Sequence, residues 1–410
     1  MSDPVTPPGR FPSRIPRHEP RGVVQIACIS GGDVKALLSA ALALGAFWAA
    51  AALWIDGPGG AAGAGLAALL VLVCAGIALR VRPFRRAALT VAALVAAVAL
   101  WWASLPPSNG RDWLDDVARL PRARIDGDRL TIENVRNFSY RSESDYDARW
   151  ETRSFDLSKL RSLDLFLSQW SSPHIVHTIL AWEFEDGPPL AISIETRKER
   201  GEQYSALLGF FRQFELYYVV ADERDVIGVR ASQRGERLRL YRLHVPRERA
   251  RELLVAYARE IDDLAERPRW YNALTTNCTT VIRDHVRTAA GTMPWSWKIL
   301  ANGHLDELLY ERGRIDTSLP FAELRERSDV TDRARAAEGA PDFSARIREG
   351  LPGAEGVRPG RGGYLPPRPG RRDGRDEDTL RPGGARDPLV ALLDRRREPL
   401  SGPRGARRPL

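Results

Sequence analysis

The chain has 410 residues and a formal net charge of +8, a length that allows one or two domains with a buried core. The charge does not indicate a nucleic-acid partner, because residues 353–410 contain 14 arginines and 8 acidic residues and so supply +6 of it. The sequence has no HExxH pair, no paired-cysteine spacing and no glycine-rich phosphate loop between a strand and a helix, so we expect no metal and no cofactor.

Three apolar runs follow a proline- and arginine-bearing leader, residues 1–34, which we expect to be disordered. The runs cover residues 36–55, 60–79 and 87–105, and none contains a charged residue. Each is close to the ~20 residues that a helix needs to cross ~30 Å of hydrocarbon. The region 35–105 is therefore predicted to form three transmembrane helices.

Basic residues flank these runs on one side only. The leader carries several arginines, and the segment between the second and third runs, "RVRPFRR", carries four, whereas the loop at 56–59 has no basic residue. The positive-inside rule places basic flanks in the cytoplasm. We therefore expect a multi-pass protein of the inner membrane with a cytoplasmic N-terminus, and everything after Leu105 outside.

A soluble domain is predicted for residues 111–351, after the linker "PPSNG" at 106–110. Alternating and β-branched runs indicate strands, and apolar residues with helical spacing indicate helices. The expected strands are 128–136, 175–184, 190–197, 214–221 and 237–245, and the expected helices are 157–170, 199–211, 246–266 and 279–289. The fold class is α+β, with a mainly antiparallel sheet, and aromatic residues such as Tyr204, Phe210, Phe211 and Phe214 are expected in its core.

Residues 352–410 form an arginine-, proline- and glycine-rich tail. The tail has too few apolar side chains to offset the entropy lost on ordering, so we expect disorder.

Cys278 is the one thiol of the predicted outer domain, because Cys28 lies in the leader and Cys74 in the second apolar run. A left-over cysteine in an oxidising compartment indicates either a reactive thiol or a bond to another molecule; a buried structural cysteine is the alternative. Cys278 stands where a helix is predicted to begin, and a helix N-terminus lowers a thiol pKa. Asn277 and Thr279 could cap this end and polarise an oxyanion.

A nucleophilic thiol needs a base, and the predicted domain offers His174, His177, His244, His285 and His304. Residues 175–184 and 190–197 read as a hairpin, with Glu185-Asp186-Gly187-Pro188-Pro189 as its turn. If Phe184 pairs with Leu190, then His177 faces Arg197, and Glu195 lies diagonally on the same face, where it would orient the imidazole. His285 is two helical turns from Cys278, about 10 Å, which is too far for direct contact.

Several long stretches resemble the Lnb N-terminal periplasmic domain family. They are "LTIENVRNFSYRSESDYDARWETRSFDLSKLRSLDLFLSQW", "VHTILAWEFEDGPPLAISIETRKERGEQYSALLGFFRQFELYYVVADERDVI" and "NALTTNCTTVIRD", within residues 111–350. The resemblance implies a bacterial envelope protein with a permuted NlpC-type, papain-like fold. It also implies a catalytic pair in which the histidine of "HT" is His177 and the cysteine of "TNCT" is Cys278.

Members of this family include a lipoprotein N-acyltransferase, so the resemblance implies acyl transfer through a thioester on Cys278. The partners would then be a phospholipid acyl donor, a lipoprotein acceptor and the membrane. Two alternatives stay open at this point: a cell-wall thiol amidase or peptidase that uses the same pair, and a non-catalytic envelope scaffold whose cysteine is packed.

Overall fold

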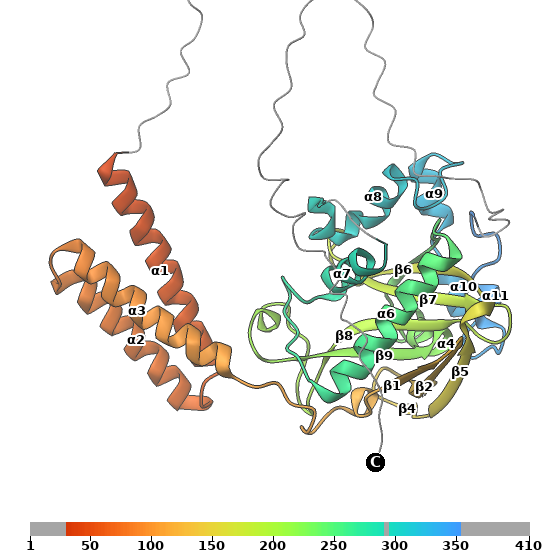
Figure 1. The fold of residues 1–410 in the computed structure, drawn as a ribbon, viewed down its shortest axis with the longest axis horizontal. Helices are drawn as coiled ribbons and strands as arrows, with labels where there is room; N and C mark the ends of the chain where they lie inside the picture. The colour runs from red at the N-terminus through yellow and green to blue at the C-terminus, as the bar shows by residue number, and fades with distance from the viewer. Residues whose placement is uncertain (1–29, 291–294, 354–410) are drawn as a thin grey trace, which may run out of the picture. The chain divides into compact units, whose positions relative to one another are not determined.

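A computed structural model describes residues 30–290 and 295–353 (Figure 1). Cys28, the predicted leader up to residue 29 and the predicted tail from residue 354 lie outside the described residues.

Three long apolar helices begin the described chain: α1 (Gly31–Ile55), α2 (Gly60–Arg80) and α3 (Phe84–Ser104). Each is long and apolar enough to span a membrane. The first begins at residue 31, earlier than the predicted residue 36, because Ser30 and Asp33 form a capping box that satisfies the first backbone N–H groups. The α1 helix packs against both α2 and α3.

An eight-stranded, mostly antiparallel sheet forms the centre of the following domain. Its order is β1-β2-β9-β8-β7-β6-β10, with β5 paired to β2 and one parallel contact between β2 and β9. The bounds are β1 Arg122–Asp126, β2 Arg129–Arg136, β5 Trp150–Asp156, β6 Leu160–Gln169, β7 His177–Phe184, β8 Leu190–Arg197, β9 Glu215–Asp222 and β10 Arg237–Arg242, and a separate small sheet pairs β3 Ser139–Tyr140 with β4 Tyr146–Asp147. The predicted α+β class with a mainly antiparallel sheet is confirmed.

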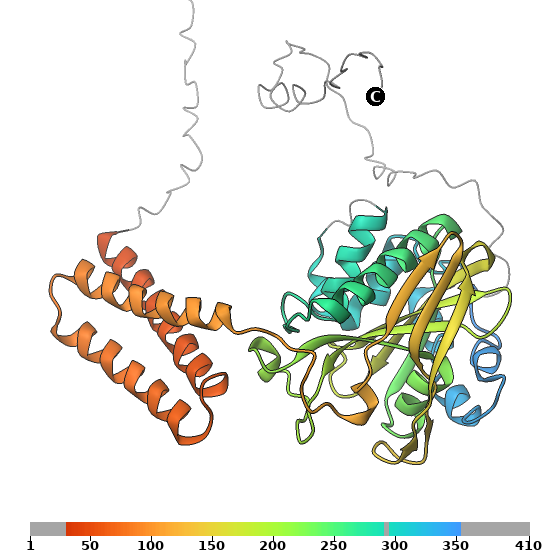
Figure 2. The ribbon, with the colours of Figure 1, turned by 60° about the horizontal axis from the view of Figure 1, so that its bottom comes forward.

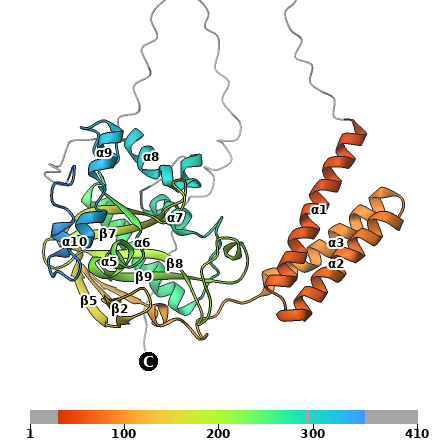
Figure 3. The same ribbon diagram turned by 180° about the vertical axis from the view of Figure 1, so that it is seen from behind.

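Helices cover both faces of the sheet (Figures 2 and 3). On one face, α6 and α7 contribute to a core that includes Leu254, Tyr257 and Cys278. On the other face, α4, α5, α10 and α11 pack over a second core that includes Ile179, Ala181 and Ala191. The helix bounds are α4 Glu223–Val226, α5 Gly228–Ser232, α6 Arg247–Glu266, α7 Cys278–Ala290, α8 Leu305–Glu311, α9 Phe321–Arg327, α10 Thr331–Ala336 and α11 Phe343–Arg346.

The predicted helix at 157–170 is wrong. Asp156 caps only a short 3-10 turn, Leu157–Lys159, and strand β6 follows directly. Both faces of β6 are buried, so its apolar residues form a nearly continuous run instead of a clear alternation. The period-two spacing of Leu163, Leu165 and Leu167 is the strand signal.

The predicted helix at 199–211 is also wrong. This segment consists of turns and one 3-10 turn, Leu208–Phe210. Gly201 has a φ of 89°, a left-handed conformation that interrupts a right-handed helix. The segment is therefore a loop, and it lies beside the site described below.

The register predicted for the β7–β8 hairpin is wrong by two residues. Trp182 pairs with Leu190 and Ile179 with Ser193, so the same register sets His177 opposite Glu195 and not opposite Arg197. A shift of two residues keeps every side chain on its face of the sheet. Glu195 thus remains on the same face as His177, and it comes closer than the predicted diagonal.

Candidate active site

Cys278 is the first residue of α7 and is buried. Asn277 caps this helix: its side-chain oxygen accepts hydrogen bonds from the backbone N–H groups of Thr279 and Thr280, both at 2.9 Å. The cap holds the sulfur at the end of the helix where backbone N–H groups concentrate and where the helix dipole is positive. The local sequence thus places a thiol in surroundings that favour a thiolate.

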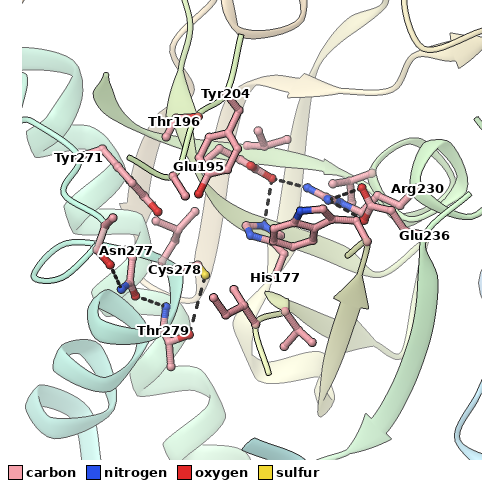
Figure 4. Close-up of a pocket in the computed structure, with 18 of the residues that line it drawn as sticks. His177, Glu195, Thr196, Tyr204, Arg230, Glu236, Tyr271, Asn277, Cys278 and Thr279 are labelled. Atoms are coloured by element: carbon pink, nitrogen blue, oxygen red, sulfur yellow. Dashed lines mark hydrogen bonds and ion pairs between the residues drawn. The ribbon is translucent and has the colours of Figure 1, made fainter. Parts of the chain in front are cut away.

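His177 is the first residue of β7 and is buried beside Cys278 (Figure 4). Its Nε2 atom lies 2.6 Å from the hydroxyl of Ser193 and 3.0 Å from a carboxylate oxygen of Glu195. The Ser193 hydroxyl donates to the same carboxylate oxygen at 2.6 Å. Since Nε2 is held by these two residues of β8, Nδ1 is the ring nitrogen that is left to face the thiol.

Electrostatics make Cys278 and His177 an ion pair. Burial would raise the pKa of Cys278, but attraction and a hydrogen bond from His177, with hydrogen bonds from Thr178, lower it to about 6. Burial would lower the pKa of His177, but the Glu195 carboxylate and the Cys278 thiolate raise it to about 9. Between these values the pair is thiolate and imidazolium. Despite burial, His177 and Arg230 hold the pKa of Glu195 well below its usual range.

A second layer of charge lies behind Glu195. Arg230 of α5 donates to Glu195 at 2.6 Å and to Glu236 at 3.0 Å, and Glu236 accepts a short hydrogen bond from Ser168 of β6. Arg230, Glu236 and Ser168 are all buried. The guanidinium therefore fixes the carboxylate that orients the imidazole.

Asn302 joins the two chain segments that carry the reacting groups. Its side-chain oxygen accepts from the backbone N–H of Val176 at 2.9 Å, and its amide donates to the Val176 carbonyl at 2.7 Å. The same amide donates to the Thr279 hydroxyl, also at 2.7 Å. Val176 directly precedes His177, and Thr279 directly follows Cys278. One buried amide therefore links the two segments that carry the imidazole and the sulfur.

The pair lines a cavity of about 600 Å³. Figure 4 shows Tyr204 and Tyr271 on the Cys278 side of His177, with Arg230 and Glu236 on its other side. The labelled residues on the side of the thiol thus include two tyrosines and the uncharged polar residues Asn277 and Thr279, whereas Arg230 and Glu236 on the opposite side are charged. The prediction that Tyr204 and Phe210 belong to the core is wrong, since both line this cavity and both are exposed, whereas Phe211 and Phe214 are buried as predicted.

The other candidate histidines do not reach the thiol. His285 accepts from or donates to the Tyr218 hydroxyl at 2.8 Å, and its ring packs on Tyr257. His174 and His304 contact each other, with ring nitrogens 3.0 Å apart. The backbone N–H of His244 bonds to the carbonyl of Arg314. None of these four lines the cavity, whereas His177 does.

The predicted oxyanion residues have other contacts. The amide of Asn277 donates to the Ala273 carbonyl at 2.7 Å, while its oxygen caps the helix. The Thr279 hydroxyl accepts from Asn302 and lies 3.8 Å from the Cys278 sulfur. An oxyanion role for Asn277 and Thr279 stays a prediction, and the described contacts give both a positioning role.

Sequence reasoning missed Ser193, Arg230 and Asn302. Ser193 has a local signal, because it lies two residues before Glu195 and therefore on the same face of β8. Arg230 has a weaker one, as a lone charge in the apolar stretch "VIGVRAS" that needs a buried partner. Asn302 has none, because its partner Val176 is 126 residues away.

The donor set does not suit a metal. Among residues 30–290 and 295–353, no group of three or more His, Cys, Asp or Glu side chains is arranged to hold a metal ion. The chemistry that the pocket residues themselves offer is a nucleophilic thiolate, a proton donor and acceptor at Nδ1, and a carboxylate that orients the ring.

Part of the chain matches a known protein family. Residues 146–303 match the Lnb N-terminal periplasmic domain family. This segment contains His177, Glu195, Cys278 and Asn302. Searches of curated proteins and of solved structures found no match. The chain thus has three candidate membrane spans followed by a segment that matches the Lnb N-terminal periplasmic domain family.

Proposed function

We propose that this Lnb-domain protein is a membrane-anchored thiol acyltransferase. Cys278 would take an acyl chain from a phospholipid as a thioester and pass it to the N-terminal amine of a lipoprotein. The observation that carries the proposal is the thiolate–imidazolium pair of Cys278 and His177 in a cavity whose lining includes the aromatic side chains of Tyr204, Phe210 and Tyr271. Three candidate membrane spans on the same chain keep that cavity near both lipid substrates.

In the first step the Cys278 thiolate attacks the ester carbonyl of the phospholipid. The carbon–sulfur bond forms, and the tetrahedral oxyanion then collapses with cleavage of the ester carbon–oxygen bond. His177, already an imidazolium, gives its Nδ1 proton to the departing alcohol. The products of this half-reaction are a lysophospholipid and an acyl-Cys278 thioester.

In the second step the unprotonated amine of the lipoprotein N-terminus attacks the thioester carbonyl. His177, now neutral, accepts the proton that the amine loses, and the carbon–sulfur bond breaks to return the thiolate. The sum of the two steps is ester plus amine giving amide plus alcohol. Glu195 stabilises the imidazolium that each cycle regenerates, and Arg230 keeps that carboxylate ionised.

The oxyanion needs hydrogen-bond donors at the sulfur. As the first residue of α7, Cys278 has a backbone N–H without an acceptor inside the helix. This N–H lies beside the carbonyl that the sulfur attacks, so we assign it as one oxyanion donor.

We propose that the N-terminus lies in the cytoplasm and the catalytic domain in the periplasm of a bacterial inner membrane. The four arginines between Arg80 and Arg86 support this orientation, because they join α2 to α3 on the side opposite the domain. Reporters fused after residue 353 test it: alkaline phosphatase should be active and β-galactosidase inactive. The reverse result would refute the proposed localisation.

Intact-mass measurement of the full chain, purified from membranes, tests the thioester. We expect a fatty acyl adduct that neutral hydroxylamine removes, and we expect Cys278→Ala to abolish it. Cys74→Ala is the matched control, since Cys74 lies within α2 and should leave the adduct unchanged. Loss of the adduct in Cys74→Ala alone would show that Cys74, and not Cys278, carries the acyl group.

Two other outcomes would replace the proposal. If the protein cleaves cell-wall peptides in the absence of lipid and never carries an acyl group, it is a thiol amidase or peptidase of the NlpC type. If the Cys278→Ala variant restores the wild-type phenotype to a deletion strain completely, the domain is a scaffold. The apolar and aromatic residues in the cavity lining favour acyl transfer over both.

A further inference from the structure

Exposed apolar side chains of the domain gather at one place. Within residues 105–290 and 295–353, every large apolar side chain that is exposed either lines the cavity or lies within four residues of one that does. We call this set the mouth rim; its members are Trp170, Ile175, Tyr204, Leu207, Phe210, Leu274, Trp295, Trp297 and Leu300. Scattered exposed apolar residues are normal, whereas a set confined to one opening marks an interaction surface.

Contacts between residues next to several of these members place them in two groups, which we call the first and second lip. In the first lip the backbone N–H of Ala273 bonds to the Gly209 carbonyl at 2.7 Å, which holds Leu274 beside the loop of Leu207 and Phe210. In the second lip the Trp297 ring packs on His304, and His304 contacts His174, the neighbour of Ile175. The lips belong to the same cavity, because Phe210 and Ile175 both line it.

The exposure is large enough to need an occupant. Leu207 is 67% exposed and Trp297 is 53% exposed. Exposing this much apolar surface of leucine and tryptophan to water costs free energy. Tryptophan and tyrosine are also enriched at the boundary between lipid headgroups and hydrocarbon.

The tether, residues 105–110 after α3, joins the domain beside the first lip. The backbone N–H of Ser108 bonds to Glu215, and the Asn109 amide bonds to the carbonyls of Leu264 and Ala265. Ser108 is four residues after the end of α3, and Glu215 is five residues after Phe210. Extended chain of these lengths, together with the Glu215 side chain and its hydrogen bond, spans roughly 40 Å at most, so the first lip lies within that distance of the end of α3.

We infer that the mouth rim is a membrane-docking surface, seated in the leaflet on the domain's side of the bilayer that the three helices span. Docked in this way, the cavity opens into lipid and not into water, and an acyl chain reaches Cys278 between the two lips. The inference deepens the proposed function, but it stands on the position of the apolar rim and on the tether, whether or not the thiol is acylated.

Fluorescence quenching of the full chain in vesicles tests the docking. An environment-sensitive label is attached to Leu207→Cys or to Trp297→Cys in a background in which the native cysteines are replaced. The control is Asp186→Cys, which is exposed and lies in the turn at the opposite end of β7 from His177. The vesicles contain phosphatidylethanolamine and phosphatidylglycerol with brominated acyl chains, and iodide serves as the aqueous quencher.

We expect the brominated lipid to quench labels at 207 and 297 several-fold more strongly than the label at 186, and iodide to show the opposite order. Equal quenching by lipid at all three positions would overturn the inference. Protection of the rim labels from iodide without quenching by lipid would overturn it too, because a protein surface would then cover the mouth.

A second variant separates docking from chemistry. Leu207→Asp should weaken lipid quenching of the label at position 297 several-fold while leaving the midpoint of denaturant unfolding unchanged. Lipid quenching at the rim with no acyl group on Cys278 would refute the proposed function alone. An acyl group on Cys278 without lipid quenching at the rim would refute the docking inference alone.

Discussion

Strand β6 touches two buried ion clusters, and they differ in where their contacts end. The site cluster consists of Glu195, Arg230 and Glu236, with Ser168 of β6 as its polar neighbour. The far cluster begins four residues earlier on β6, about 13 Å away by strand rise. It consists of Asp164, Arg242, Glu183, Arg348 and Glu223.

The far cluster is a chain of ion pairs that ends on two carboxylates, Glu223 and Glu183. Arg348 bridges Asp164 and Glu223, and Arg242 bridges Asp164 and Glu183, so each charge meets an opposite charge. None of these residues lines the cavity. The site cluster instead passes from Arg230 through Glu195 to His177, which faces a thiol in the cavity. An ion network whose charges pair only with one another outside the cavity thus stabilises the fold. A network that ends on a titratable group in a cavity also shifts the pKa of that group.

The largest effect on thiol reactivity is expected for His177→Ala. Without the imidazolium, burial should return the pKa of Cys278 from about 6 to 9 or above. The thiolate fraction at pH 7 then falls about a hundredfold. The rate of iodoacetamide alkylation, followed on the Cys278 peptide by mass spectrometry, measures this change. His304→Ala should leave the rate unchanged; an equal loss in both variants would mean that the fold had been damaged.

A smaller effect is expected for Glu195→Gln. In the wild type the alkylation rate should fall as pH drops through about 6, because the lowered pKa of Cys278 keeps the thiolate only above that value. Removing the carboxylate destabilises the imidazolium and should move this midpoint upward by about one to two pH units. The full pH profile of alkylation measures the shift. An unchanged midpoint would show that Glu195 does not support the pair.

Removing one arginine from each cluster sharpens the comparison. Arg230→Met and Arg348→Met each leave buried carboxylates without their partner, and each should cost about 3–5 kcal/mol of unfolding free energy. Only Arg230→Met should raise the pKa of His177 from about 9, because the Arg230 charge lowers that pKa. The change in alkylation rate that accompanies deprotonation of His177 should therefore move to higher pH. Denaturant unfolding and the alkylation profile measure the two effects. A pH shift in Arg348→Met would erase the distinction between the clusters.

The smallest effect is expected for Ser193→Ala. The variant loses two hydrogen bonds of 2.6 Å, but the contact of 3.0 Å between His177 and Glu195 remains. Thiol reactivity at pH 7 should therefore fall only a few-fold. Ser162→Ala is the matched control, because Ser162 donates to Glu183 of the far cluster at 2.8 Å. If Ser162→Ala slows alkylation as much as Ser193→Ala does, the two clusters are not independent.

Local signals predicted much of this molecule. Charge-free apolar runs of helical length identify the three long apolar helices, alternation identifies β2, and runs rich in β-forming residues identify β7 and β8. The start of α7 at Cys278 follows from Asn277, a residue that caps helices through its own side chain. The face shared by His177 and Glu195 was also predictable, because it survives the two-residue error in register.

The remainder depended on contacts between distant parts of the chain. Burial on both faces gives β6 a run of apolar residues that reads equally well as a helix. The hairpin turn gives no register by itself, since the first pair is Trp182 with Leu190 and seven residues separate them. Arg230 and Asn302 act through partners 35 to 126 residues away, and no spacing rule connects such positions.

Asn302 comes late in the chain. A chain that has reached its three-hundredth residue already contains both His177 and Cys278, but the amide that binds Val176 and Thr279 has not yet been added. That amide takes its place only when the segment around Gly303 docks, at a backbone approach so close that a Cβ there would lie 2.0 Å from the Pro173 carbonyl oxygen. A larger residue at position 303 would therefore displace Asn302 and, with it, the link between the two segments that carry the candidate nucleophile and its base.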